Sequence, residues 1–200
     1  MAISFGSNAE LISSDLHIKG DSRVVLDDLT GLEWLSFQET RLSNVDGSYE
    51  ERIAKMVAQK PEWRIATASE VATLFLNTFG SLDFYGINSS DQRYIDFRNQ
   101  FGVSSTFDTH YGLGLYYNNG VVRSAGTSSW NGGSIRHNAT PISYNGNGGV
   151  YNSLFMVSTG GVTYSSQNDP YFKSVQNVPT PMLFGLLGFS LLGFSKRKKQ

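Results

Sequence analysis

Side chains able to do acid–base or metal chemistry are few in this chain and far apart. The three histidines are His17, His110 and His137, and none has the spacing of a metal motif such as H-E-x-x-H. His110 lies between Asp108 and Tyr111, an order compatible with proton transfer, although a histidine in such a polar stretch is more often an exposed loop residue. We therefore expect no catalytic site built on histidine.

Composition excludes several further classes of chemistry. The chain has no cysteine, which rules out disulfides, thiolate zinc sites and cysteine nucleophiles. No nucleophile elbow, phosphate-binding loop or dinucleotide-binding glycine pattern occurs. The expectation is a protein that is not an enzyme and that carries no cofactor.

Two groups of oxygen ligands are compatible with a Ca²⁺ site. One consists of Asp21, Asp27 and Asp28, and the other is the run 167–169, Gln-Asn-Asp. Short Asp and Asn side chains also form turns by bonding their own backbone, and this interpretation is favoured. We therefore predict no metal site.

Aromatic residues between positions 110 and 152 are the best candidates for contact with a ligand. Aromatic faces stack on sugar rings while polar groups bond the hydroxyls, as in a shallow glycan site. Tyrosines along short strands are also ordinary sheet packing, so both interpretations stay open. The candidate glycan contacts are Tyr116, Tyr117, Trp130, Tyr144 and, less centrally, Tyr151.

Three helices have local start and stop signals. Residues 48–51 (Ser-Tyr-Glu-Glu) and 67–70 (Thr-Ala-Ser-Glu) both have the form of a capping box. The first helix should end at Pro61 and the second at Gly80. A third helix is expected over 90–101, where aromatic residues recur at helical spacing.

The second half of the chain has the composition of a sheet. Twelve of the 21 glycines lie between residues 102 and 170, which is typical of short strands joined by tight turns. Residues 118–120, Asn-Asn-Gly, predict a hairpin. The expected fold class is α+β, with one or more antiparallel sheets, two or three helices and a separate C-terminal hydrophobic helix. Strands are expected at 23–26, 32–35, 63–66, 113–117, 120–123 and 153–157.

Two blocks resemble domains of the Lcl C-terminal type, which are distantly C-type-lectin-like. Residues 26–35 match the family pattern D-x-x-T-G-L-x-W-L, and residues 63–67 match W-R-L-P-T, with Ala66 in place of proline and Glu70 in the helix that follows. The resemblance implies a lectin-like architecture in which Trp34 and Trp63 are core aromatics.

The last 23 residues consist of three segments in a fixed order. Residues 178–181 are rich in proline, 182–195 are apolar, and 196–200 are basic. A helix in the middle segment is apolar all round, which suits lipid, but thirteen residues span only about 20 Å of a core of about 30 Å. The alternative is a buried C-terminal helix. The predicted membrane anchor is Met182, Leu183, Phe184, Leu186, Leu187, Phe189, Leu191, Leu192 and Phe194, and the predicted cytoplasmic tail is Lys196, Arg197, Lys198 and Lys199.

This order resembles a PEP-CTERM sorting signal of exported proteins in Gram-negative bacteria that make extracellular polysaccharide. Val178, Pro179 and Pro181 match the family's Val-Pro-Glu-Pro, whereas Thr180 stands where the family has glutamate. The resemblance implies recognition by an exosortase, a membrane-embedded cysteine transpeptidase or protease. It also implies a transient stay in the inner membrane before transfer to the cell surface or the exterior.

Export predicts a division of the chain into segments. Residues 1–9 end in Ser7-Asn8-Ala9, the small-x-small form of a signal-peptidase site, and are interpreted as the remnant of a signal peptide. Residues 10–172 are the expected exported domain and 173–181 a linker. The part before Val178 has 12 basic and 17 acidic residues, so we expect no nucleic-acid partner.

Together these features predict an exported, non-catalytic surface or matrix protein associated with exopolysaccharide. Its expected partners are an exosortase, the membrane through the C-terminal helix, and polysaccharide. One alternative is a secreted hydrolase whose carboxylates converge only in the fold, and another is a lectin-like module that binds glycans.

Overall fold

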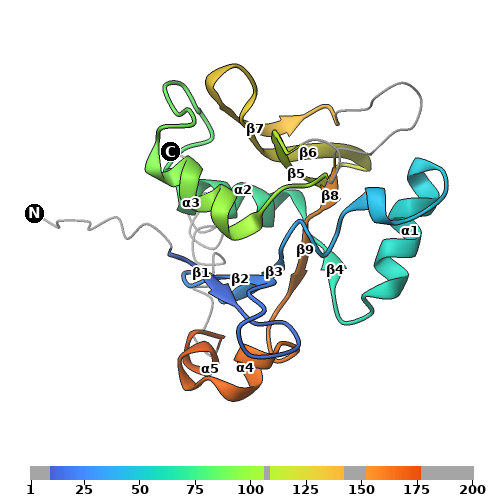
Figure 1. Ribbon diagram of the computed structural model, residues 1–200, viewed down its shortest axis with the longest axis vertical. Coiled ribbons are helices and arrows are strands. Elements are labelled where there is room, and N and C mark those ends of the chain that lie inside the picture. The colour runs from blue at the N-terminus through green and yellow to red at the C-terminus, as the bar shows by residue number, and fades with distance from the viewer. Residues whose placement is uncertain (1–9, 106–108, 142–151, 177–200) are drawn as a thin grey trace, which may run out of the picture.

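The computed structural model describes residues 10–105, 109–141 and 152–176, which form two β-sheets with helices between and around them (Figure 1). One sheet has the strand order β1-β2-β3-β9-β4 and the other the order β7-β6-β5-β8. The strands are β1 Leu11–Ser14, β2 Val24–Asp27, β3 Leu32–Leu35, β4 Arg64–Ile65, β5 Tyr111–Asn118, β6 Val121–Ser128, β7 Ser134–Ala139, β8 Ser153–Leu154 and β9 Met156–Ser158. The helices are α1 Tyr49–Gln59, α2 Ala68–Phe79, α3 Gln92–Phe101, α4 Tyr164–Asn168 and α5 Pro170–Gln176, with 3-10 turns η1 Leu42–Asn44 and η2 Trp130–Gly132.

The expected α+β class is confirmed, but the expected number of helices is wrong. The described residues hold five α-helices instead of two or three. The additional ones, α4 and α5, are short, and α5 runs to Gln176, beyond the boundary expected at residue 172. All strand pairs are antiparallel except β5 with β8, which is parallel.

The helix signals of the sequence are confirmed. Ser48 and Thr67 are the N-caps of α1 and α2, and both capping boxes are complete. Gly80 follows α2 with φ of 76°, a left-handed conformation that costs glycine little. The third helix begins at Gln92 instead of residue 90, because the Asp91 side chain accepts a hydrogen bond from the backbone N–H of Arg93 and thereby caps it.

The hairpin between β5 and β6 is also confirmed. Asn118 pairs with Val121, so the connection is the two-residue turn Asn119-Gly120. Both turn residues have positive φ, 50° and 77°, as a type I′ turn requires. The expected strands 113–117 and 120–123 are the central parts of longer strands.

Residues 153–157 were expected to form one strand, and this expectation is wrong. The segment divides at Phe155, so that β8 pairs with β5 in one sheet while β9 pairs with β3 and β4 in the other. Strands β1 and β7 complete the two sheets and had no strong signal in the sequence. The chain therefore crosses from one sheet to the other within six residues.

Helices α2 and α3 lie between the two sheets, and α1 lies to one side (Figure 1). Phe155 is fully buried at the centre, with its ring 5.7 Å from that of Trp34 on β3 and 6.3 Å from that of Phe75 on α2. The rings of Phe97 and Phe101 on α3 stack at 4.5 Å in the same cluster. Burial of each such ring contributes about 1.5 to 3 kcal/mol, so this aromatic cluster holds both sheets on the helices.

Candidate functional site

An open polar cavity of about 400 Å³ lies where three segments of the chain meet. These are the residue before β2, the stretch from the end of β3 to η1, and the C-terminal half of α1. Its volume is within the range of small-ligand sites, about 300 to 1,000 Å³. The lining residues are Arg23, Gln38, Glu39, Arg41, Asn44, Val45, Met56, Gln59 and Lys60.

The loop that carries Gln38 to Asn44 into the cavity is fixed to the opposite sheet. Thr40 Oγ1 donates a hydrogen bond of 2.8 Å to the Leu154 carbonyl, and the Leu154 N–H donates to the Thr40 carbonyl at 3.1 Å. Leu42 is fully buried and holds η1 in the core. This wall of the cavity is therefore anchored on both its backbone and its side chains.

Helix α1 supplies the facing wall. Its buried face contains Ile53 and Met56, and this orientation places Gln59 and Lys60 at the cavity. The capping box at Ser48 fixes where the helix begins, since the Glu51 carboxylate accepts a hydrogen bond from the Ser48 N–H at 2.8 Å. The local sequence therefore determines the helix, and packing determines which side chains reach the cavity.

Glu39 bridges two cations at this site. Its Oε1 lies 2.7 Å from Nη1 of Arg23 and its Oε2 lies 3.0 Å from Nζ of Lys60. Only 12% of the Glu39 side chain is exposed, whereas 52% of the Arg23 side chain is exposed. Pairs of this kind contribute at most about 1 kcal/mol to stability. Their main effect is to hold three charged groups, two positive and one negative, in fixed positions.

Arg41 is the third cation of the cavity and differs from the other two. Its Nε donates a hydrogen bond of 3.0 Å to the Val103 carbonyl. Partial burial lowers its pKa through desolvation. Among the described residues no carboxylate pairs with it. The cavity therefore has three cations and one carboxylate, and the guanidinium of Arg41 is available to an anionic group.

The groups that line the cavity offer hydrogen bonds and positive charge. Glu39 is its one acidic lining residue, its oxygens are held by two cations, and no histidine lines the cavity. Glycoside-cleaving sites typically use two carboxyl groups, and the lining supplies one. Three amide side chains, those of Gln38, Asn44 and Gln59, instead offer paired donors and acceptors.

The two fully buried carboxylates lie on opposite faces of one sheet. Asp27 pairs with Leu32 and Glu33 with Leu26, so their side chains point in opposite directions. Asp27 accepts hydrogen bonds from the Leu29 and Thr30 N–H groups, and burial raises its pKa. Glu33 accepts a hydrogen bond of 2.6 Å from Thr163 Oγ1 at the start of α4. These carboxylates position a turn and a helix, and they do not form a catalytic pair.

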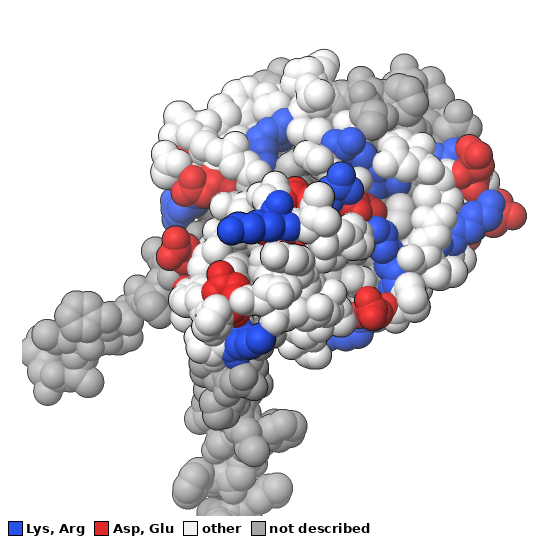
Figure 2. Space-filling view, turned by 60° about the horizontal axis from the view of Figure 1, so that its bottom comes forward, with Lys and Arg blue, Asp and Glu red and all other residues white. Residues whose placement is uncertain are grey.

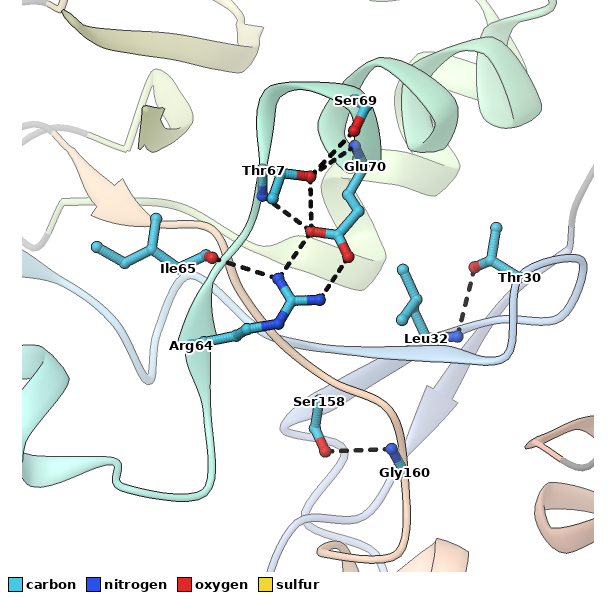
Figure 3. A network of polar contacts seen from close by, with 9 residues as sticks. All are labelled: Thr30, Leu32, Arg64, Ile65, Thr67, Ser69, Glu70, Ser158 and Gly160. Carbon is cyan, nitrogen blue, oxygen red and sulfur yellow. Dashed lines mark hydrogen bonds and ion pairs between the residues drawn. The ribbon is translucent and has the colours of Figure 1, made fainter. Parts of the chain in front are cut away.

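The second block that resembles Lcl domains forms the polar network of Figure 3. Glu70 Oε2 accepts hydrogen bonds from the Thr67 N–H at 2.8 Å, from Thr67 Oγ1 at 2.9 Å and from Nη1 of Arg64 at 2.8 Å. Nη2 of Arg64 lies 2.5 Å from Oε1, completing a two-point ion pair. Desolvation raises the pKa of Glu70, but the bonds from Arg64 and Thr67 outweigh it and lower that pKa below its usual value. The network links β4 to the start of α2.

The histidines lie in different environments. His17 is exposed in the loop after β1. His110 is also exposed, with its ring 5.1 Å from that of Trp130. His137 on β7 is partly buried against Phe75, and desolvation lowers its pKa. Asp108, the expected neighbour of His110 in a proton-transfer cluster, lies outside the described residues.

The oxygen-ligand groups act as turn and cap formers. Asp21 accepts hydrogen bonds from the Leu16 and His17 N–H groups, at 2.7 and 2.8 Å. The Asp28 side chain accepts a hydrogen bond from the Glu10 N–H, and the Asp169 side chain accepts one from the N–H of Tyr171 in α5. Within residues 10–105, 109–141 and 152–176, no three His, Asp or Glu side chains gather as a metal-binding group.

The aromatic glycan surface is not brought together as expected. Tyr116 is 1% exposed, so its candidacy as a surface contact is wrong: it faces the core, and its hydroxyl accepts a hydrogen bond from the Asn138 N–H. Tyr117 and Trp130 are 45% and 54% exposed, but they lie toward opposite ends of the β5–β6 hairpin, about 20 Å apart along the strands. Tyr144 and Tyr151 lie outside the described residues.

The predicted sorting motif 178–181, the apolar segment 182–195 and the basic tail 196–200 all lie outside the described residues, as does the segment 1–9. Within the part of the chain that the structure describes, no helix combines the length and apolar character needed to cross a bilayer.

Comparisons with protein-family models, with curated proteins and with solved structures found no match to this chain. The resemblances to PEP-CTERM signals and to Lcl domains therefore stay predictions.

No pattern in the sequence indicates the polar cavity. Arg23, Arg41 and Lys60 are separated by 18 and 19 positions and occur in no motif. Only the packing of α1 beside the loop after β3 brings them together.

Proposed function

We propose that this chain is an exported, non-catalytic protein that a PEP-CTERM-type signal delivers to the cell surface or extracellular matrix, where its domain associates with exopolysaccharide. The observation that carries this proposal is the order of the C-terminal segments: Pro-rich residues 178–181, apolar residues 182–195 and basic residues 196–200. An exosortase would be the processing partner, and the apolar segment would hold the precursor in the inner membrane until cleavage.

The chemistry of the described domain supports a role without catalysis. Its two buried carboxylates face opposite sides of a sheet, and Glu70 is occupied in a helix cap. These positions do not favour the hydrolase alternative, which needs two carboxyl groups about 5 to 10 Å apart in one cleft.

Surface charge supports a partner other than nucleic acid. On the face shown in Figure 2, Lys and Arg side chains are interspersed with Asp and Glu. Nucleic-acid sites instead gather cations in a continuous patch along the phosphate backbone.

Processing of the tail tests the sorting part of the proposal. The full-length gene with its native upstream sequence is expressed in an exosortase-containing host, and the mass of the product is compared for wild type, P179A/P181A and Thr180→Glu. The double proline variant should stay unprocessed and membrane-bound, while Thr180→Glu should be processed at least as well as wild type. Equal processing of all three would show that residues 178–181 are not a sorting motif.

A lectin-like binding role is the second candidate, favoured by the polar cavity. A glycan array probed with the exported domain tests it, with Trp130→Ala as a variant for the exposed aromatic surface and Arg41→Gln for the cavity. Loss of binding in Arg41→Gln alone would place the glycan in the cavity. Absence of binding to every glycan would leave a purely structural role in the matrix.

A further inference from the structure

We propose that the polar cavity between α1 and the loop after β3 is a binding subsite for an acidic sugar, with the carboxylate of a uronic acid residue paired to Arg41. The inference rests on the proposed association with polysaccharide and adds to it the chemical class of the glycan.

The charge of the cavity selects an anion. Arg23, Arg41 and Lys60 line it together with a single carboxylate, that of Glu39. Because Glu39 holds the other two cations at 2.7 and 3.0 Å, the site retains an excess of positive charge next to Arg41. Charges that are partly shielded from water attract a counter-ion more strongly than exposed ones.

Arg41 is suited to a carboxylate in particular. Its Nε is used by the Val103 carbonyl, which fixes the plane of the guanidinium. Among the described residues, no hydrogen-bond or ion-pair partner lies at its Nη1 or Nη2 atoms. An immobilised guanidinium with free terminal nitrogens binds a carboxylate with well-defined geometry.

The other lining residues select a sugar over a simple acid. Gln38, Asn44 and Gln59 are exposed amides, each with a donor and an acceptor for neighbouring hydroxyls. Val45 and Met56 also line the cavity but are only 7% and 3% exposed, so the surface that a ligand meets there is mainly polar. One cavity of about 400 Å³ therefore combines a carboxylate site with several partners for hydroxyl groups.

Binding of matched oligosaccharides to the full exported domain tests this inference. The probes are tetragalacturonate and the same tetrasaccharide with every carboxylate methyl-esterified, compared by isothermal titration calorimetry at low salt. Tetragalacturonate should bind at least about tenfold more tightly than its ester, because a charge-assisted pair is lost in the ester. Raising the salt concentration should weaken binding of the acid and leave that of the ester unchanged.

Three variants locate the site. Arg41→Gln should weaken tetragalacturonate binding about tenfold or more and leave ester binding unchanged. Gln59→Glu is a second test in case Arg41→Gln folds poorly. It adds a carboxylate at the exposed end of α1 without touching the core, and it should also weaken tetragalacturonate binding. Lys19→Gln removes one charge from an exposed loop outside the cavity, and its affinity should stay within twofold of wild type.

The outcomes separate this inference from the proposed function. Equal affinity for the acid and its ester, or wild-type affinity in both cavity variants, would overturn the acidic-sugar subsite while leaving glycan association intact. Binding of neither probe, together with an empty glycan array, would overturn both the subsite and the association with polysaccharide, whereas the sorting proposal would depend only on the tail variants. Normal acid binding together with equal processing of all tail variants would sustain the subsite and overturn only the sorting proposal.

Discussion

Removal of the Glu70 carboxylate should destabilise the domain by an amount that the structure allows to be estimated. Glu70 accepts a hydrogen bond from the Thr67 N–H at the start of α2 and forms a two-point ion pair with Arg64. Loss of the helix-cap bond costs about 1 kcal/mol, and loss of an ion pair with a half-exposed arginine costs up to about 1 kcal/mol. Glu70→Ala should therefore lower the free energy of unfolding by about 2 kcal/mol and the Tm by about 4 to 8 °C.

The pH dependence of this effect has a definite sign. The folded-state pKa of Glu70 is below its usual value, so the native state binds fewer protons than the unfolded state as the carboxyl titrates. The stabilisation is complete above the unfolded pKa of about 4.3 and is lost as the pH falls toward the folded pKa. The difference between wild type and Glu70→Gln should consequently shrink below about pH 4.

Urea unfolding of the domain, followed by tryptophan fluorescence between pH 3 and 7, measures both quantities. Glu51→Ala is the matched control, because Glu51 completes the other capping box without an arginine partner and should have a smaller effect. Two results would refute this assignment of the energy. One is a loss of unfolding free energy below about 0.5 kcal/mol in Glu70→Ala, and the other is a stability difference between wild type and Glu70→Gln that does not change with pH.

Three further predictions concern the core. Gly114→Ala should cost about 2 to 3 kcal/mol in urea unfolding, since a Cβ there would lie 2.5 Å from a buried Phe155 carbon, and part of the loss should be recovered when Phe155 is shortened to leucine. Asp27→Asn should change stability by less than about 1 kcal/mol at pH 7, whereas Asp27→Ala should cost about 2 kcal/mol because two turn N–H groups lose their acceptor. The raised pKa of Asp27 also predicts that wild type loses some stability as the pH rises through it, a component that Asp27→Asn should lack. For His137 the pKa is lowered, so His137→Gln should reduce the loss of stability measured when the pH falls from 7 to 5.

Much of the local structure follows from the sequence alone. Ser48 and Thr67 specify the starts of α1 and α2, and Asn119-Gly120 specifies the β5–β6 hairpin. These signals depend on hydrogen bonds and backbone angles within about four residues, so they act before any long-range contact forms. The sorting proposal likewise depends on the order of short segments, and no tertiary contact enters it.

Which side of a strand becomes buried was decided by packing. Tyr116 and Tyr117 are adjacent tyrosines, yet the first is in the core and the second is 45% exposed. Alternation along a strand is visible in the sequence, but the face that meets α2 depends on register and on the position of the helix. For the same reason the predicted glycan surface was partly wrong.

Only the tertiary structure determined the division at Phe155 and the polar cavity. Strands β8 and β9 belong to different sheets because the ring of Phe155, which lies between them in the chain, fills the aromatic core. Two partners of this ring, Trp34 and Phe75, are more than 50 positions away in the sequence. The cavity cations come from three segments that have no shared motif. Short-range chemistry thus determines where helices and turns begin, whereas the grouping of charges that can bind a ligand follows from contacts between segments far apart in the chain.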